Sequence, residues 1–211
     1  MAPCPPAITP AQITGVVLAG GRGTRMGGVD KGLQLYNDVP LALHSLRRLR
    51  VQVGTAMVNA NRHLETYQTF GVPVWPDVVP GYLGPLAGFI TALQHCDTPF
   101  LATVPCDVPW FPVDLVARLA RGLAGVGSEI AMACTPADGQ AGAAAWQIHP
   151  VFCLLHTSLL PSLEQFVASG GRKVEDWIAG HARASVPFDT PRAFFNVNTL
   201  AQLQEAQTPA R

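Results

Sequence analysis

The sequence contains little charge. Only 13% of its 211 residues are charged, and 14 basic side chains balance 14 acidic ones, so the formal net charge at pH 7 is zero. A neutral chain has no electrostatic footprint for duplex nucleic acid or an anionic membrane surface, so any recognition of phosphate must be local. The hydrophobic fraction of 48% is ample for a packed core and excludes the composition of disordered chains.

Long apolar runs and cysteine motifs are also missing. The longest apolar stretches, such as residues 16–19 and 152–155, fall far short of the roughly 20 residues that cross a bilayer. Five scattered cysteines without a CxxC pair argue against a disulfide framework and against a zinc knuckle. Residues 1–12 lack a basic segment followed by an apolar one, so they predict a flexible lead-in rather than an export signal. We therefore expect a cytoplasmic protein with no membrane segment.

Apolar runs alternate with helical patterns along the first 125 residues. Strands are predicted at 14–19, 55–60, 72–75 and 100–104, and helices at 41–49, 63–70, 86–93 and 113–123. This alternation is typical of a single-domain, Rossmann-like α/β sandwich of three layers, in which helices cover both faces of a mostly parallel sheet.

The pattern is looser in the remainder of the chain. It predicts strands at 130–134, 146–155 and 184–188, and helices at 158–169, at 174–179 and from 199. His149-Pro150 interrupts the second of these strands, which indicates an edge strand or a bulge.

The first predicted strand is followed by five glycines within residues 20–28. Glycine lets the backbone approach a ligand closely, with its N–H groups directed at an anion. Arg25 and Lys31 fall within reach of the same segment. The spacing fits neither the GxGxxG fingerprint nor the GxxxxGK[ST] loop. The segment therefore predicts a polyphosphate loop of a third kind, the alternative being a plain glycine turn.

Polar residues follow the other predicted strands, where doubly wound sheets bind their ligands. Asn59 can read a base edge or a ribose, whereas Asn61 can also cap the helix that follows. Asp77 can accept hydrogen bonds from guanine or serve as an ordinary turn residue. Asp107, between two prolines, is well placed to hold Mg²⁺ against substrate phosphates, in preference to capping a helix.

Residues for covalent catalysis are not apparent in the sequence. Cys106 stands beside Asp107 without a histidine at suitable spacing, and the six histidines form neither HxH nor HExxH. We interpret Cys106 and the histidines as structural, and His149 is the histidine of most interest.

Residues 18–33, LAGGRGTRMGGVDKGL, resemble the signature LAGGxxxRMGxxDK of the molybdenum cofactor guanylyltransferases, the MobA family of nucleotidyltransferases. Further segments of that family follow in the same order: VNANRH (58–63), GPLAG (84–88), PCDVP (105–109), HPV (149–151) and FFNVNT (194–199). The similarity extends from residue 13 to about residue 203. It implies a nucleotide-diphospho-sugar transferase type of fold, with one domain at 13–206 and a tail at 207–211. Within it, residues to about 125 form the GTP-binding half and residues from about 126 form the acceptor half.

The resemblance implies transfer of GMP from Mg-GTP to molybdenum-molybdopterin, which gives the guanine dinucleotide cofactor and pyrophosphate. The chemistry of the residues agrees with this transfer: we expect Asp107 to hold Mg²⁺, with Mn²⁺ as an alternative ion, and Arg25 and Lys31 to lie at the developing pyrophosphate. Asn196 and Asn198 would border the metal or the acceptor. Expected partners are other proteins of cofactor biosynthesis and the recipient molybdoenzymes. The implied nucleotide-binding residues are Leu18, Ala19, Gly20, Gly21, Lys31, Asn59, Asp77 and Asp107.

Two departures from the family pattern lie on the acceptor side. The chain continues NVNTLAQL where relatives often have NVNTP with acidic residues, and residues 138–147 are rich in alanine. Two nucleotidyltransferases stay open as alternatives, the cytidylyltransferase of the same pathway, whose signature has LAAG in place of LAGG, and a sugar-phosphate transferase. A GTP-binding cofactor carrier without catalysis is the alternative of another class.

Overall fold

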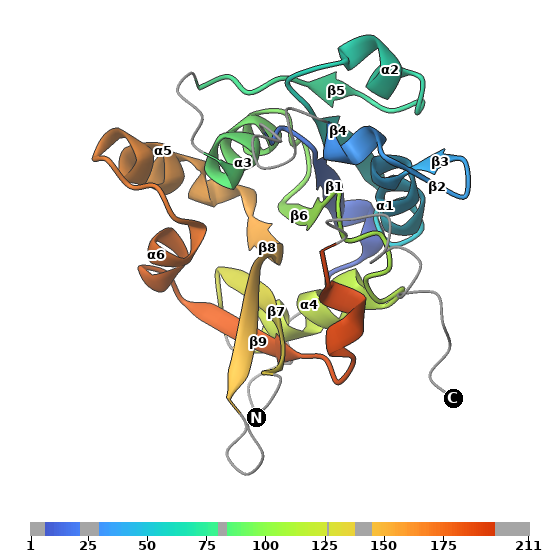
Figure 1. Ribbon diagram of the computed structural model, residues 1–211. Helices are drawn as coiled ribbons and strands as arrows, with labels where there is room; N and C mark the ends of the chain where they lie inside the picture. The colour runs from blue at the N-terminus through green and yellow to red at the C-terminus, as the bar shows by residue number, and fades with distance from the viewer. Residues whose placement is uncertain (1–6, 22–29, 80–83, 126, 138–144, 197–211) are drawn as a thin grey trace.

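The computed structural model describes residues 7–21, 30–79, 84–125, 127–137 and 145–196. Its main sheet has seven strands in the order β5-β4-β1-β6-β8-β7-β9 (Figure 1). Neighbouring strands are parallel except at β8, which runs antiparallel to both β6 and β7. The predicted mostly parallel α/β fold is therefore confirmed. The strands of this sheet are β1 (Ile13–Leu18), β4 (Thr55–Asn59), β5 (Val74–Trp75), β6 (Phe100–Pro105), β7 (Ile130–Pro136), β8 (Trp146–His156) and β9 (Arg183–Pro187).

Six α-helices accompany the strands in the described part of the chain. They are α1 (Leu41–Arg50), α2 (Leu64–Gln68), α3 (Pro85–Gln94), α4 (Leu115–Gly125), α5 (Leu160–Ala168) and α6 (Val174–Ala179). Short 3₁₀ turns occur at η1 (Pro10–Gln12), η3 (Lys31–Leu33), η4 (Thr157–Leu159) and η5 (Pro191–Phe194). No helix in these ranges is long and apolar enough to span a lipid bilayer.

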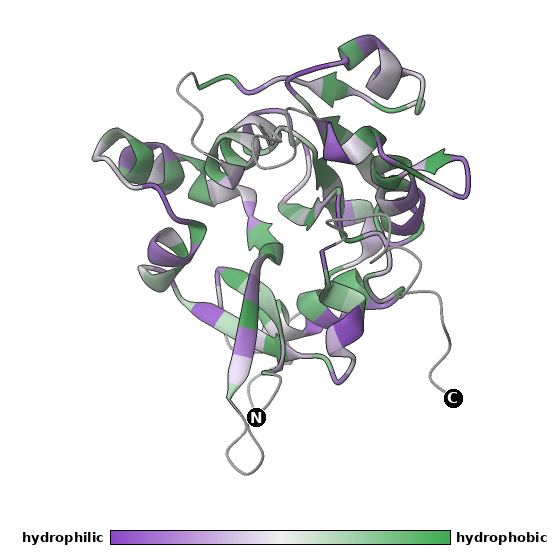
Figure 2. Cartoon of the chain, in the orientation of Figure 1, coloured by the Kyte–Doolittle hydropathy of each residue, from purple (hydrophilic) through white to green (hydrophobic). Residues whose placement is uncertain are grey.

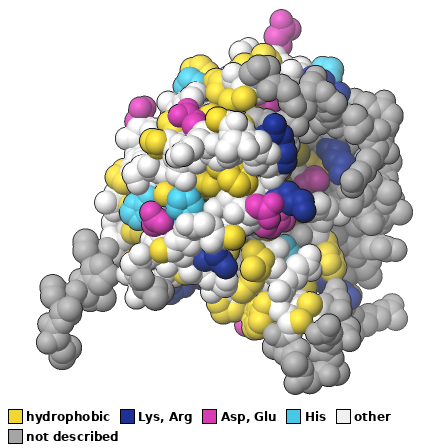
Figure 3. Space-filling view, turned by 90° about the vertical axis from the view of Figure 1, so that its left-hand side faces the viewer, with side chains coloured by type: hydrophobic (Ala, Val, Ile, Leu, Met, Phe, Trp, Pro, Cys, Tyr) yellow, Lys and Arg dark blue, Asp and Glu magenta, His cyan; other side chains and the backbone are white. Residues whose placement is uncertain are grey.

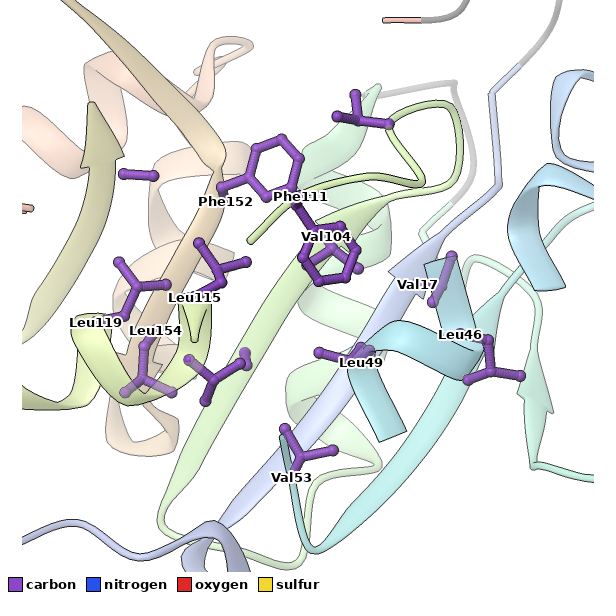
Figure 4. Packing of buried hydrophobic residues seen from close by; sticks show 14 of the residues in the cluster. Val17, Leu46, Leu49, Val53, Val104, Phe111, Leu115, Leu119, Phe152 and Leu154 are labelled. Atoms are coloured by element: carbon purple, nitrogen blue, oxygen red, sulfur yellow. The ribbon is translucent and has the colours of Figure 1, made fainter. Parts of the chain in front are cut away.

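The helices cover both faces of the sheet, as predicted. Because side chains alternate along a strand, Val17 and Val16 of β1 belong to different core clusters. Val17 shares its cluster with residues of α1 and α4 on one face, and Val16 shares its cluster with residues of α3, α5 and α6 on the other. Figure 4 shows the first of these layers, with Leu46 and Leu49 of α1 beside β1. Full burial of one such leucine stabilises the fold by roughly 1.5–3 kcal/mol, so this packing fixes the helices on the sheet.

The sequence predicted that the strand containing His149-Pro150, which is β8, is either an edge strand or bulged. β8 lies between β6 and β7, so it is not an edge strand. The bulge alternative is correct, because Met132 pairs with Cys153 whereas the next residue, Ala133, pairs with His149. Residues 150–152 therefore lack partners in β7, and Pro150, which has no N–H to donate, lies within that interruption. Figure 2 shows more hydrophilic residues in the part of β8 before this interruption and hydrophobic ones in the part after it.

A two-stranded hairpin, β2 (Leu35–Tyr36) with β3 (Val39–Pro40), was not predicted. Its turn residues Asn37 and Asp38 both have positive φ, 47° and 60°. Asparagine and aspartate tolerate this region better than most residues, so the Asn-Asp pair was the available signal. The helix predicted from residue 199 lies outside the described residues.

A hydrogen-bond chain connects α5 and α6 to the start of β7. Ser162 Oγ lies 2.9 Å from His181 Nε2, and His181 Nδ1 lies 3.2 Å from Glu129 Oε2. A serine, a histidine and a carboxylate in this order resemble the catalytic triad of a hydrolase. Trp177 Nε1, however, also donates to Ser162 Oγ at 3.3 Å. The serine oxygen is thus held within the packing of the two helices, and we interpret the chain as structural. On the face of the molecule that carries these helices, basic and acidic side chains are interspersed (Figure 3).

Candidate active site

The carboxyl ends of β1, β4 and β6 meet at one edge of the sheet. Leu18 is paired with Asn59 on one side and with Pro105 on the other. Ala19 N donates to Asn59 O at 2.8 Å, and Cys106 N donates to Leu18 O at 3.1 Å. The backbone of Leu18 and Ala19 therefore lies between Asn59 and the segment that carries Asp107.

Asp77, which follows β5, is held in this edge by two asparagines. Asn59 Nδ2 donates to Asp77 Oδ1 at 2.8 Å, and Asn61 Nδ2 donates to Asp77 Oδ2 at 2.7 Å. Asn61 Nδ2 also donates to Gly20 O at 3.0 Å. Asn61 does not cap α2, because the N-cap is His63, in the left-handed region and without a side-chain cap bond. Of the predicted nucleotide residues, Gly20, Asn59 and Asp77 are thus in one cluster.

Of the two predicted cations, Arg25 and Lys31, the described residues include Lys31, which lies at this edge of the sheet. Its Nζ lies 3.5 Å from Asp107 Oδ2, in an ion pair whose side chains are 29% and 15% exposed. Gly21 is described at the start of the glycine segment, where its carbonyl accepts from Arg62 Nη2 at 3.2 Å. Arg25 lies outside the described residues, so its predicted role stays a prediction.

A buried hydrogen bond positions the turn that carries Lys31. Asp30 caps this 3₁₀ turn by accepting from Gly32 N at 3.1 Å, and the same carboxylate accepts from Tyr67 Oη at 2.8 Å. The ring of Tyr67 is fully buried, and burial, together with nearby negative groups, raises the pKa of Tyr67 above its ordinary value. A Cβ on Gly32 would lie 2.3 Å from the Tyr67 hydroxyl, so the close approach requires glycine.

Asp107 follows β6 at a fixed point of the backbone. Ser45 Oγ of α1 donates to the carbonyls of Pro105 and Cys106, both at 3.4 Å. Burial raises the pKa of the Cys106 thiol, and the nearby carboxylates of Asp107 and Asp30 add to the shift. Cys106 therefore stays protonated at neutral pH. A protonated thiol suits the predicted packing role, whereas a nucleophilic cysteine would have to be a thiolate.

A pocket of about 390 Å³, which Asp107 also lines, lies between β6, β7, β8 and η5. His149 forms part of its wall: Nε2 lies 2.9 Å from Thr135 Oγ1, and the ring stacks on Phe194 with a centroid distance of 4.7 Å. Burial lowers the pKa of His149, so its ring is neutral at pH 7. Asn196, predicted on the acceptor side, also lines the pocket, whereas Asn198 lies outside the described residues. The remaining lining residues are Pro105, Gln147, Ile148, Pro150, Val151, Phe152, Pro191 and Phe195.

Comparison with known proteins identifies the family. A model of the MobA-like NTP transferase domain matches residues 15–185. The molybdenum cofactor guanylyltransferase of Acidovorax sp. (strain JS42) is 58% identical over 197 residues, which cover 91% of this chain and 93% of that protein. The chain belongs to the molybdenum cofactor guanylyltransferase family. The enzyme of the same name from Albidiferax ferrireducens is 55% identical over 94% of this chain and 97% of its own.

A solved structure has the same fold. The molybdopterin-guanine dinucleotide biosynthesis protein A of Archaeoglobus fulgidus is similar with a TM-score of 0.70 and 19% identity, over 92% of this chain and 96% of that one. The family model and the relatives confirm the family membership that residues 18–33 predicted. The solved structure confirms the predicted fold.

Sequence reasoning missed several contributors to the site. Tyr67 lies in a segment that was predicted only as a helix, and Thr135 directly follows the strand predicted at 130–134. His149 was interpreted as structural, although the family segment HPV that contains it was recognised. Within the described ranges, no group of three or more His, Cys, Asp or Glu side chains could hold a metal ion by itself.

Proposed function

We propose that this protein transfers GMP from GTP to molybdenum-molybdopterin and so forms the guanine dinucleotide cofactor and pyrophosphate. The names of its relatives support this reaction. The structural observation that carries it is the position of Asp107. Its carboxylate pairs with Lys31, and Asp107 is also one of the residues that line the 390 Å³ pocket, so one residue would border both proposed substrates.

The GTP site would consist of backbone and amide groups at the strand ends. The backbone from Leu18 to Gly21 would approach the nucleotide, with Asn59 and Asp77 beside the nucleoside. An aspartate carboxylate accepts hydrogen bonds only, which matches the N1–H and 2-amino donors on one edge of guanine.

Asp107 would hold Mg²⁺, or Mn²⁺ in its place. A single carboxylate fits this ion because Mg²⁺ is usually bound by one or two carboxylates together with substrate phosphates and water. When bound, the ion would neutralise negative charge on the phosphates of GTP.

The reaction requires no general base from the protein. The terminal phosphate of the acceptor has a second pKa of about 6 and is largely ionised at neutral pH. One of its oxygens attacks the α-phosphorus, and the bond to the oxygen that bridges the α- and β-phosphorus atoms breaks as pyrophosphate leaves. Lys31, together with Arg25 of the glycine segment, would stabilise the charge that develops on the leaving group.

The pocket would receive molybdopterin. Its wall combines the stacked rings of His149 and Phe194 with polar groups of Thr135 and Asn196, which suits a flat heterocycle with hydrogen-bonding edges. Asn198 would extend this acceptor side. Contacts with other biosynthetic proteins and with recipient molybdoenzymes stay predictions from the resemblance.

The experiment is incubation of the purified protein with Mg-GTP and molybdenum-molybdopterin, followed by assay of pyrophosphate and mass spectrometry of the product. We expect both pyrophosphate and the guanine dinucleotide. Turnover with CTP but not GTP would indicate the cytidylyltransferase, and GTP binding without pyrophosphate would indicate a carrier.

A further inference from the structure

The side-chain amide of Asn61 is hydrogen-bonded to two segments of the proposed nucleotide site, one at Gly20 and one at Asp77. Its Nδ2 donates to Gly20 O at 3.0 Å and to Asp77 Oδ2 at 2.7 Å, and its Oδ1 accepts from Asp77 N at 2.8 Å. An amide nitrogen has two hydrogens, so both donors of Asn61 are occupied. The side chain is thus bonded at three points, far more than an exposed loop asparagine requires.

These bonds join the ends of two strands that are not neighbours in the sheet. β4 separates β1 from β5 in the strand order, and Asn61 spans the end of β4 to connect Gly20 with Asp77. The packing around Gly20 is close: a Cβ there would lie 2.9 Å from Asn61 Nδ2 and 3.0 Å from Asn59 Oδ1. These contacts therefore fix the position of the Asp77 carboxylate relative to the beginning of the glycine segment.

The two asparagines also fix the orientation of the Asp77 carboxylate. Each of its oxygens accepts one amide hydrogen, Oδ1 from Asn59 and Oδ2 from Asn61. A carboxylate oxygen has two acceptor positions, so each oxygen retains one for a ligand. Two acceptors in a fixed plane match two parallel donors, which is the pattern of N1–H and the 2-amino group of guanine and the geometry of bidentate recognition.

We propose that Asn61 is a positioning residue that orients Asp77 and thereby sets the preference for guanine nucleotides. The inference rests on the proposed function, because it concerns the GTP of that reaction. Asn61 itself makes no contact with the nucleotide in this account. Its removal would leave the Asp77 carboxylate held by Asn59 at Oδ1 alone. The hydrogen bond from the base to Oδ2 would then weaken most.

The test compares GTP with ITP, whose base lacks the 2-amino group. Loss of one hydrogen bond to a charged acceptor corresponds to about tenfold to hundredfold in binding, so the wild type should use GTP better than ITP by about that factor in kcat/KM. In Asn61→Asp, which keeps the shape but loses both donors, kcat/KM for GTP should fall at least about tenfold, mainly through KM. The value for ITP should fall much less, so the ratio of the two moves towards one.

Asn61→Ala gives the same comparison without the added charge, and it serves if Asn61→Asp does not fold. Asn37→Asp is the matched control, because Asn37 lies at the exposed turn between β2 and β3 and tolerates the same chemical change. A purely structural role of Asn61 would lower turnover of GTP and ITP equally. An unchanged ratio in both Asn61 variants, or equal use of GTP and ITP by the wild type, would overturn this inference alone. A wild type that uses neither nucleotide would refute the proposed function and this inference with it.

Discussion

Replacement of Asp107 by asparagine should separate catalysis from folding. The substitution keeps the size and shape of the side chain and removes its charge, at the point where the Lys31 ion pair meets the pocket. Loss of one preorganised electrostatic contact to the transition state costs about 2.7–4 kcal/mol, or a factor of roughly 10²–10³ in kcat. We therefore expect Asp107→Asn to lower turnover at least about a hundredfold, and to raise the Mg²⁺ concentration needed for half-maximal rate.

The expected effect on stability is far smaller. The Lys31–Asp107 pair is 3.5 Å long and partly exposed, and ion pairs of this kind contribute at most about 1 kcal/mol. In a chain of this length that corresponds to about 2–4 °C in Tm. A variant with a nearly unchanged melting temperature and a hundredfold lower rate would thus have lost chemistry and kept its fold.

The assay is steady-state release of pyrophosphate over a range of Mg²⁺ concentrations, with a parallel thermal melt. Asp114→Asn is the matched control, because Asp114 is 55% exposed and pairs with Arg118 at 4.0 Å outside the proposed site. It should stay within about twofold of the wild type, the change expected of a surface substitution remote from the reaction. A rate for Asp107→Asn within the same range would refute the role assigned to this carboxylate.

Three further predictions concern Lys31 and two buried groups. Lys31→Ala should lower kcat at least about a hundredfold in the same assay, and near-normal turnover would contradict its role at the leaving group. Tyr67→Phe leaves Asp30 without its hydroxyl partner, so the free energy of unfolding in urea should fall by about 1.5–3 kcal/mol. An unchanged free energy would contradict the proposal that this hydrogen bond positions the Lys31 turn. Burial raises the pKa of Cys153 to about 12, so its contribution to stability is present below about pH 9 and is lost as the pH rises towards 12. Above pH 9, the unfolding free energy of Cys153→Ala should therefore fall less steeply with pH than that of the wild type, and the two slopes should differ by up to about 1.4 kcal/mol per pH unit. Equal slopes for the two proteins would contradict this prediction.

The nucleotide half of the site could be predicted because it depends on local signals and one general rule. The apolar runs that became β1 and β6 end in glycines and in Pro105. Asn59 ends β4, and Asp77 and Asp107 each lie two residues after the end of β5 and β6. Parallel strands bring their carboxyl ends to the same edge, so Asn59, Asp77 and Asp107 could be grouped without knowledge of any contact.

The rest depends on contacts that periodicity does not contain. Tyr67 and Asp30 are 37 positions apart, and neither pattern indicates that the hydroxyl meets the carboxylate. His149-Pro150 indicated an irregular strand, but the position of β8 between β6 and β7 follows from tertiary packing. The pocket could not be predicted for the same reason, because β7, β8 and η5 each contribute only part of its wall.

The central claim is that these strand ends bind magnesium and GTP together, and calorimetry tests it most directly. Titration of the wild type with GTP should show one saturable site per chain when Mg²⁺ is present and much weaker uptake when the ion is chelated. The Mg²⁺ dependence should disappear in Asp107→Asn, and CTP should bind more weakly than GTP. Uptake of GTP that is indifferent to Mg²⁺, or no uptake at all, would contradict the account.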